Sequence, residues 1–342
     1  MDAVSDKIGH GLTRRRFLGN MSALGAAWLL GVPRKASAEP PPEITKIRLL
    51  KAKGALCFAP QYLAEALLAL EGFTDVEYVQ LTVGNAVDVI DQGHADLSLD
   101  AAPTIVFGME RHSSVVVLAG IHAGCYELFG SGQIRTIQDL KGRTVPIYGF
   151  GAADHVLLAS MLAYVGINPM KEIHWLVAED GDTMRLFVEG KADAFMGFPP
   201  RPQELRARKI GRVIVNTAQD RPWSHYFCCM ASGNRDFVRK HPVATKRALR
   251  AFLKAADLCA QDPARTARFL VDQGYEPRYD IALDVLQDVS YRSWREFDPE
   301  DTLRFHALRL HEVGMITMSP QKLITQGTDW RFFNELKREM KT

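Results

Sequence analysis

The chain has 342 residues, of which 47% are hydrophobic and 24% are charged, and its formal net charge is +2. This length and composition predict a globular protein with one to three domains and substantial hydrophobic cores. The sequence holds no polybasic or polyacidic run, so we expect no nucleic-acid partner.

Residues 1–38 have the pattern of an export signal. Twin arginines followed by Phe-Leu occur within 13–18 (TRRRFL), a short apolar stretch interrupted by glycine follows, and 36–38 reads ASA. That stretch is too short and too rich in Gly for a membrane anchor. We therefore expect twin-arginine export to the periplasm, with cleavage near Ala38/Glu39. The mature chain would carry 36 basic and 38 acidic residues, so its net charge of −2 gives no argument for an anionic partner.

The first lobe is predicted to follow a Pro-rich leader at 39–43. Hydrophobic alternation predicts strands at 44–50 and 76–81, and a short continuous apolar run predicts a buried strand at 115–119. A helix is predicted at 60–70, with a proline in its first turn.

Two similar 22-residue segments, 82–103 and 179–200, lie 97 positions apart. They read TVGNAVDVIDQGHADLSLDAAP and EDGDTMRLFVEGKADAFMGFPP, with two aligned glycines, an Ala-Asp pair and a final proline in common. Each predicts a helix, a tight turn, an apolar strand and a Pro-containing loop. Such self-similarity predicts two lobes of one design. Because loops beyond strand ends build ligand sites in α/β sheets, we expect a small-molecule cleft between the lobes.

The chain is predicted to cross to the second lobe at 122–128 and to return at 224–231. The second lobe would then be inserted in the first, with 39–125 and 227–342 in one lobe, 126–226 in the other, and the two crossings as a hinge. Alternating strands and helices predict a parallel sheet in each lobe. The elements expected in the second lobe are a turn into a strand at 139–145, a helix at 155–165 with Asp154 as its N-cap, and strands at 173–177 and 212–216.

The pattern after 234 is helical. We expect a C-terminal helical tail that wraps the lobes and carries no chemistry of its own. Its predicted helices are 235–259, 263–273, 281–289, 299–313 and 320–341.

The strongest candidate for ligand binding is a loop of small residues between a strand and a helix. Glycine and alanine let a ligand approach backbone N–H groups, and the start of a helix favours an anion. The alternative is that these residues only turn the chain tightly. No G-K-[ST] follows and the dinucleotide spacing is absent. The candidate residues are Phe150, Gly151, Ala152, Ala153, Asp154 and His155.

Other candidates lie at strand ends and near the crossings. Asn85 and Asp182 follow Gly84 and Gly181 between a strand and a helix, so they either cap helices or contact a ligand. Asp100 follows a buried strand and suits an amine or hydroxyl group. The aromatic candidates, which could equally be core residues, are Phe58, Tyr126, Phe198 and Trp223.

No catalytic residue, metal site or cofactor is predicted. The five cysteines have irregular spacing and form no C-x-x-C, so the sequence indicates neither a disulfide framework nor a zinc site. His122 with Cys125, and His225 with Cys228, are local pairs that we interpret as hinge packing.

The run 139–143 (DLKGR), the small-residue loop ahead of His155 and Leu158, and each Gly-x-Ala-Asp resemble a known family. They are similar to ABC-importer substrate-binding proteins of the nitrate/sulfonate/taurine class, which is related to thiamine-pyrimidine-precursor proteins. The resemblance implies a two-lobed, type II-like periplasmic-binding-protein fold. It also implies a monomer that delivers a small solute to an inner-membrane permease. Ala152 and Ala153 stand where sulfonate and nitrate binders often have Ser or Thr, so a flatter aromatic, pyrimidine-like or carboxylated ligand is equally consistent.

Two alternatives follow from the same resemblance. One is an iron-dependent pyrimidine-precursor synthase on this fold; those enzymes carry a Cys-rich iron-binding motif, to which 227–230 (FCCM) is only weakly similar. The other is a periplasmic sensor subunit that presents its ligand to a membrane receptor.

Overall fold

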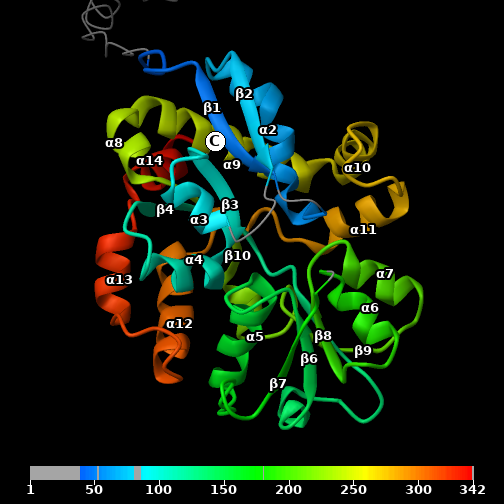
Figure 1. Ribbon diagram of the computed structural model, residues 1–342. Coiled ribbons are helices and arrows are strands. Elements are labelled where there is room, and N and C mark those ends of the chain that lie inside the picture. Colours follow the sequence, from blue (N-terminus) through cyan, green and yellow to red (C-terminus); the bar gives the residue numbers. More distant parts are fainter. Residues whose placement is uncertain (1–38, 52–53, 81–85, 180, 341–342) are drawn as a thin grey trace, which may run out of the picture. The chain divides into compact units, whose positions relative to one another are not determined.

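The computed structural model describes residues 39–51, 54–80, 86–179 and 181–340 (Figure 1). The predicted export signal and the candidates Gly84 and Asn85 lie outside the described residues. Residues 41–342 form one compact unit, to which the following description applies. Within the described part of the chain, no helix has the length and apolar character needed to cross a membrane.

The first lobe is built on a five-stranded sheet in the order β2-β1-β3-β10-β4. β1 is parallel to β2 and β3, whereas β10 is antiparallel to both of its neighbours. β3 and β4 are buried along their whole length, as expected for strands covered on both faces. The strands are β1 (Lys46–Lys51), β2 (Asp75–Gln80), β3 (Leu97–Ala101), β4 (Val115–Ala123) and β10 (Phe227–Asn234).

The second lobe has two small sheets. β5 lies between β8 and β9 and is antiparallel to both, while β6 and β7 form a separate parallel pair. Two hydrogen bonds between Thr144 at the start of β6 and Asp193, which precedes β8, connect the two sheets. The strands are β5 (Glu127–Gly130), β6 (Thr144–Ile147), β7 (His174–Val177), β8 (Ala194–Gly197) and β9 (Arg212–Asn216).

The aspartate of each Gly-x-Ala-Asp segment makes the same two bonds in its own lobe. The Arg48 N–H donates to the Asp96 carboxylate over 2.7 Å, and the Asp96 N–H donates back to the Arg48 carbonyl over 2.8 Å. In the second lobe Thr144 and Asp193 exchange the corresponding bonds, both of 2.9 Å. Each aspartate thus connects the strand that follows it to another strand of its lobe, β1 for Asp96 and β6 for Asp193, which gives the sequence repeat a structural cause.

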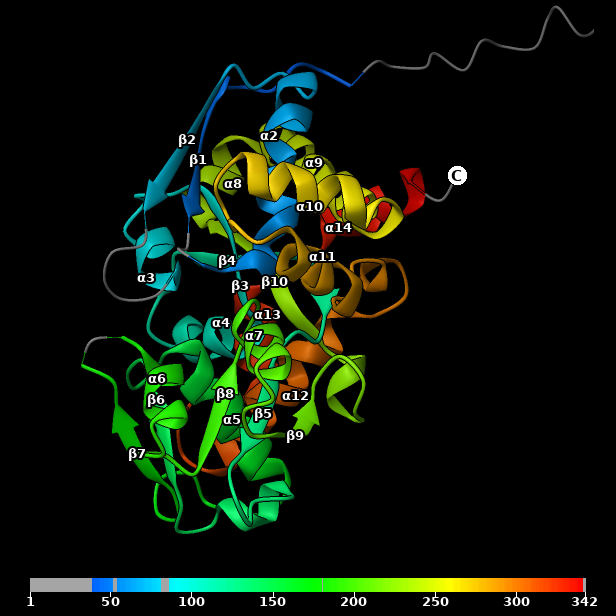
Figure 2. The ribbon, with the colours of Figure 1, turned by 90° about the vertical axis from the view of Figure 1, so that its right-hand side faces the viewer.

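Helices cover both sheets, and the C-terminal ones reach both lobes (Figures 1 and 2). α9 packs on α2, and α12 packs on α4 of the first lobe and α5 of the second. The helices are α2 (Ala59–Leu70), α3 (Ala86–Asp91), α4 (Ala102–Met109), α5 (Ala153–Tyr164), α6 (Thr183–Val188), α7 (Arg201–Ala207), α8 (Arg235–Lys240), α9 (Pro242–Gln261), α10 (Pro263–Asp272), α11 (Tyr279–Asp288), α12 (Pro299–Glu312), α13 (Pro320–Gly327) and α14 (Arg331–Glu339). Short 3₁₀ turns are η1 (Leu56–Phe58), η2 (Ile137–Leu140), η3 (Trp223–His225) and η4 (Ser293–Arg295).

The two connections between the sheets run in contact. One links β4 to β5 through 124–126, and the other links β9 to β10 through 217–226. The Thr217 N–H and hydroxyl both donate to the Tyr126 carbonyl over 2.9 Å, and the Tyr126 N–H donates to the Thr217 hydroxyl oxygen. A Cβ on Gly124 would lie 2.0 Å from the Thr217 carbonyl oxygen, so only glycine permits this approach.

Two sequence predictions about local structure are wrong. Pro103 does not lie in a loop but in the first turn of α4, whereas Pro200 lies in a turn between β8 and α7, as predicted. Because proline lacks an N–H, it suits the start of a helix, a possibility that the loop prediction ignored. Asp154 is not an N-cap, because α5 begins one residue earlier, with Ala152 as the cap.

The two longest predicted tail helices are each divided in two. The first is interrupted at His241, which precedes Pro242 and has a non-helical ψ of 61°. A residue before proline is disfavoured in the helical region, which explains the break. The second ends at Gly327, and α14 starts after Trp330.

We predict that Asp193→Ala lowers the free energy of unfolding by about 1–3 kcal/mol, because the Thr144 N–H loses its acceptor at the sheet edge. Asp193→Asn keeps an acceptor oxygen and should lose less. Urea denaturation of the purified protein measures both, with the exposed Asp272→Ala as control, expected within about 0.5 kcal/mol of wild type. Equal stability of Asp193→Ala and wild type would contradict the structural role of this bond.

Candidate functional site

A pocket lies where the two connections meet the lobes. Its cavity volume is about 20 Å³, which is room for about one water molecule in this arrangement of the lobes. Both connections, both lobes and the C-terminal tail supply its walls. The lining residues are Ala101, Pro103, Gly124, Tyr126, Leu157, Thr217, Trp223, Tyr226, Phe227, Cys228 and His306.

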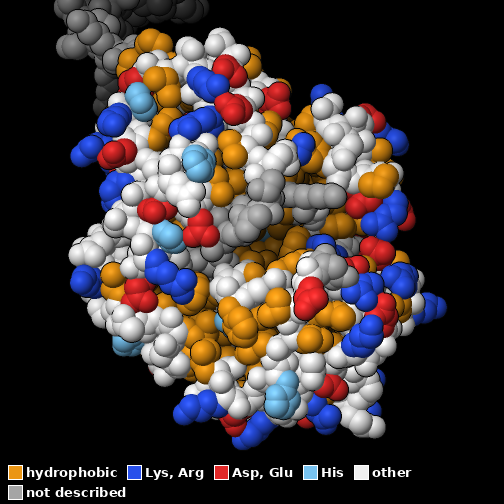
Figure 3. Space-filling model, viewed as in Figure 1, with side chains coloured by type: hydrophobic (Ala, Val, Ile, Leu, Met, Phe, Trp, Pro, Cys, Tyr) orange, Lys and Arg blue, Asp and Glu red, His pale blue; other side chains and the backbone are white. Residues whose placement is uncertain are grey.

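On the face shown in Figure 3, hydrophobic side chains lie inside a hollow at the junction of the two lobes. The lobes also touch directly there, because the Leu56 N–H of η1 donates to the Pro199 carbonyl over 3.4 Å. Gly151 of the second lobe faces Phe107 of α4, since a Cβ on this glycine would lie 3.0 Å from that ring. Segments of both lobes therefore border the same junction.

Aromatic rings and one arginine form a cluster beside the pocket. The Phe198 ring lies 5.7 Å from the Tyr126 ring and 6.2 Å from the Tyr148 ring, centroid to centroid. The Arg201 guanidinium lies 5.1 Å from the Phe198 centroid and 5.5 Å from that of Tyr148. Among the described residues, no carboxylate lies within ion-pair distance of Arg201. The Arg201 guanidinium thus makes cation–π contacts with the Tyr148 and Phe198 rings.

The loop before α5 is organised by its own buried side chains. The Asp154 carboxylate accepts hydrogen bonds from the Tyr148 and His155 N–H groups. Burial raises the pKa of Asp154 to about 7, although those bonds and the charge of Arg201 act to lower it. The Gly151 N–H donates to His155 Nδ1 over 3.1 Å, so this ring carries its proton on Nε2. Burial lowers the pKa of His155 to about 4.

The structure distributes the predicted site residues over several environments. Tyr126 and Trp223 line the pocket, and Phe198 contacts Tyr126. Phe150 is 68% exposed, whereas Phe58 is packed in the core. Ala152 and Ala153 begin α5, and Asp182 caps α6 by accepting from the Arg185 N–H. Their roles in ligand binding stay predictions.

Asp100 is buried at the end of β3, next to the pocket residue Ala101. One carboxylate oxygen accepts from the Ala101 N–H, and the other has no hydrogen-bond partner. Burial raises the pKa of Asp100 to about 7.

Sequence reasoning missed several residues of this region. Tyr148 and Arg201 were not candidates, although Arg201 directly follows the Phe-Pro-Pro end of the second repeat, which could have drawn attention to it. His306 shows that the tail, besides wrapping the lobes, contributes to the pocket wall. Four buried side chains with metal-binding atoms, Cys57, His122, Cys125 and Cys229, also come together beside the pocket, where the cysteine spacing predicted nothing.

A profile of the NMT1/THI5-like family matches residues 69–266, more than half of the chain. The chain belongs to this family. A 4-amino-5-hydroxymethyl-2-methylpyrimidine phosphate synthase of Saccharomyces cerevisiae is 25% identical to it over 272 residues, which cover 75% of this chain and 73% of the yeast protein.

Solved structures confirm the fold of this NMT1/THI5-like protein. The periplasmic nitrate-binding protein NrtA from Synechocystis PCC 6803 is similar with a TM-score of 0.72 and 16% identity, covering 88% of this chain and 90% of that one. The alkanesulfonate-binding protein SsuA from Xanthomonas axonopodis pv. citri, bound to MOPS, has a TM-score of 0.64 and 17% identity, with coverages of 86% and 100%. The predicted two-lobed α/β periplasmic-binding-protein fold with a helical C-terminal region is therefore confirmed.

We predict that Asp154→Asn weakens the pH dependence of stability between about pH 4 and 7. The raised pKa means that folded Asp154 keeps a proton that the unfolded chain loses near its ordinary pKa of 3.8. Stability therefore falls as the pH rises through this window, by at most about 1.4 kcal/mol per pH unit for one group. Asparagine has no such proton, so the decline becomes shallower.

Urea denaturation at pH 5, 6 and 7, compared between wild type and Asp154→Asn, measures this difference. Asp100 and His155 also have shifted pKa values, but both remain in the variant. The exposed Asp272→Asn should keep the wild-type slope. Parallel curves for wild type and Asp154→Asn would show that Asp154 is not protonated in the folded protein.

Proposed function

We propose that this protein is the periplasmic solute-binding component of an ABC importer. In this proposal it captures a small solute at the junction of its lobes and delivers it, as a monomer, to a membrane permease. The observation that carries the proposal is the pocket whose walls come from both lobes and both connections. A ligand that contacts both lobes binds the closed arrangement better than an open one, and this difference in affinity drives closure. The fold shared with NrtA and SsuA supports the same conclusion.

The solute that fits best is a small anion with an aromatic or otherwise flat body. Arg201 supplies a positive charge without a carboxylate at ion-pair distance among the described residues, and Tyr126, Tyr148 and Phe198 supply flat apolar faces beside it. A guanidinium binds carboxylate, sulfonate or phosphate oxygens through paired hydrogen bonds. The site therefore combines an anchor for the charge with a surface for the rest of the solute.

The first experiment is a thermal-shift screen of the purified protein against nitrate, alkyl and aromatic sulfonates, aromatic carboxylates and pyrimidines with and without phosphate. A binding solute raises Tm by mass action, and the rise grows with its concentration. Absence of any shift across this panel would count against a small-solute receptor.

We predict that Arg201→Gln weakens binding of the solute found in this screen by roughly 10- to 100-fold, because a charged hydrogen bond contributes about 1.5–3 kcal/mol. Arg201→Lys keeps the charge but loses the paired geometry, so its affinity should lie between the two. Isothermal titration calorimetry measures each. Arg208→Gln, at the other end of α7, is the matched control and should bind as wild type does. Wild-type affinity in Arg201→Gln would place the anion elsewhere.

The proposal includes export of the chain and removal of its leader. Cell fractionation should recover the protein in the periplasm, and intact-mass measurement should show a chain starting near Glu39. Replacement of Arg14 and Arg15 by lysine should retain it in the cytoplasm, because the twin arginines identify the export route.

A second candidate function is pyrimidine phosphate synthesis. The similarity to the yeast synthase favours it, since that similarity extends over three quarters of this chain. Complementation distinguishes the two functions: residues 39–342 are produced in a yeast strain that lacks its own synthases. Growth without added pyrimidine, with a supplemented culture as the viability control, would establish the enzyme. We expect no growth.

A further inference from the structure

Five side chains with sulfur or imidazole donors lie together beneath the pocket. Cys57 comes from η1, His122 from β4, Cys125 from the first connection, and Cys228 and Cys229 from the start of β10. One donor atom from each of Cys57, His122, Cys125 and Cys229 lies within 4.8 Å of the others. All four residues are buried, with exposed fractions of 6% or less. The four residues come from three segments of the chain, of which only 122–125 supplies two.

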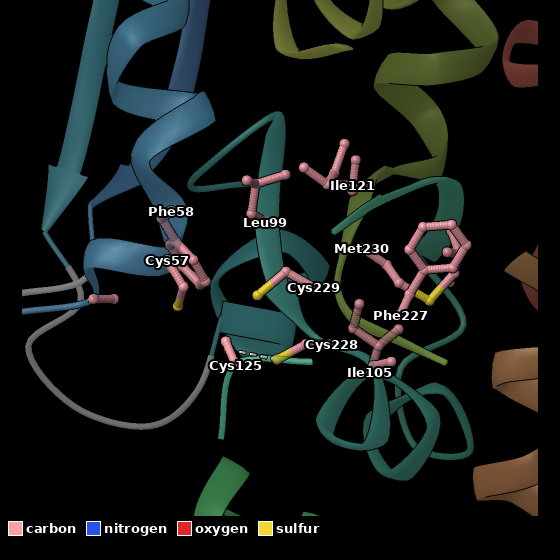
Figure 4. Packing of buried hydrophobic residues seen from close by; sticks show 14 of the residues in the cluster. Cys57, Phe58, Leu99, Ile105, Ile121, Cys125, Phe227, Cys228, Cys229 and Met230 are labelled. Carbon is pink, nitrogen blue, oxygen red and sulfur yellow. Dashed lines mark hydrogen bonds between the residues drawn. The ribbon is translucent and has the colours of Figure 1, made fainter. Parts of the chain in front are cut away.

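The strand that carries two of these cysteines is irregular at that point. The pairing of β10 with β4 shifts register between Phe227 and Cys229 and again between Cys229 and Met230. In a regular strand, successive side chains point to opposite faces, whereas a bulge re-aims them. Figure 4 shows the sulfur atoms of Cys228 and Cys229 on the side where Cys57 and Cys125 lie. The bulge therefore brings Cys229 into the group without removing Cys228.

The histidine is held in the form that binds a metal. His122 Nδ1 lies 3.1 Å from the Ala123 carbonyl oxygen, and a carbonyl can only accept, so Nδ1 carries the proton. Nε2 is then an unprotonated lone pair, and it is fully buried with no hydrogen-bond partner. Metal-binding histidines characteristically donate their other N–H to a carbonyl or carboxylate in this way. This buried lone pair among three thiols is placed to bind a metal ion, which would offset the cost of its burial.

We propose that Cys57, His122, Cys125 and Cys229 bind one zinc ion in a closed tetrahedral site. Three sulfur donors and one imidazole are a donor set typical of structural zinc. Bond lengths of about 2.0–2.3 Å place tetrahedral ligands about 3.5–3.8 Å apart, so these donors need to move by only about 1 Å. Binding releases the three thiol protons, since zinc takes the thiolates. With all four positions filled by protein, the ion joins the first connection to β10 and η1 rather than binding solute.

Cys228 has a different role in this proposal. Its sulfur lies 2.7 Å from that of Cys125, and the residue also lines the pocket. The pocket thus provides an access route for the ion. A disulfide between Cys125 and Cys228 would remove a ligand, so the two chemistries compete for Cys125. Only Cys229 of the four proposed ligands belongs to the 227–230 run that weakly resembles an iron-binding motif, and the other three come from elsewhere in the chain.

The experiment measures zinc in full-length mature protein, purified in reductant, loaded with zinc sulfate and passed through gel filtration. Elemental analysis should give about one zinc per chain for wild type. Cys228→Ser, which cannot form the competing disulfide, and Cys259→Ser, a buried cysteine in α9 outside the group, should match it. Cys57→Ser and His122→Gln should bind more than about 100-fold more weakly, since loss of even an outer partner costs 10- to 100-fold.

Two further readouts make the outcome independent of folding. Circular dichroism identifies variants that do not fold, and cobalt substitution gives the thiolate charge-transfer band and intense visible bands of a tetrahedral site in wild type. Absence of zinc in both reduced wild type and Cys228→Ser overturns the proposal. So does wild-type zinc content in folded Cys57→Ser and His122→Gln, or equal loss in Cys259→Ser. Formation of the Cys125–Cys228 disulfide when zinc and oxidised glutathione are offered together also overturns it.

Discussion

The arrangement of the whole junction depends on one close approach between the two connections that link the lobes. Gly124 has no side chain, so the Thr217 carbonyl can pass where a Cβ would stand, and Tyr126 and Thr217 then exchange three hydrogen bonds. The two connections are in contact where they leave the sheets. This contact fixes the position of the neighbouring residues in each lobe. The pocket forms here, with Gly124, Tyr126 and Thr217 in its wall. A two-lobed protein with separated connections would hold its lobes apart at this point.

The same approach explains why chemically different features share so small a region. Cys125 follows β4 directly, and Cys228 and Cys229 begin β10. Since β4 and β10 are paired neighbours, residues more than one hundred positions apart in sequence become adjacent. Cys228 lines the pocket, and its sulfur lies 2.7 Å from that of Cys125. The pocket and the group of thiols are therefore adjacent, at the part of the molecule in which the lobes are joined.

The sequence predicted the parts of this fold that local pattern and repetition encode. The strands, most helices and the duplicated design follow from hydrophobic period and from the two Gly-x-Ala-Asp segments, whose aspartates make equivalent bonds in each lobe. The exact starts of helices and the contacts between distant segments were not predicted, because local sequence pattern does not encode them. Asp154 lies one position inside the helix that it was expected to cap, and Pro103 lies in the first turn of a helix instead of in a loop. The environment of Arg201 and the meeting of Cys57, His122, Cys125 and Cys229 arise from contacts between distant segments, which spacing along the chain cannot indicate.

The local charge at the junction differs from the net charge of the chain. The charge of Arg201 and the hydrogen bonds that the Asp154 carboxylate accepts favour the ionised form of Asp154, whereas burial favours the neutral acid. Burial is the larger effect, because the pKa of Asp154 rises to about 7 instead of falling. Below that pH the carboxyl group is mostly neutral and cancels little of the charge on Arg201. In the proposed function, the aromatic faces beside this arginine lower the polarity around it and so strengthen its attraction for an anion. A chain with a small net charge can therefore present a positive, largely apolar site at the junction of its lobes.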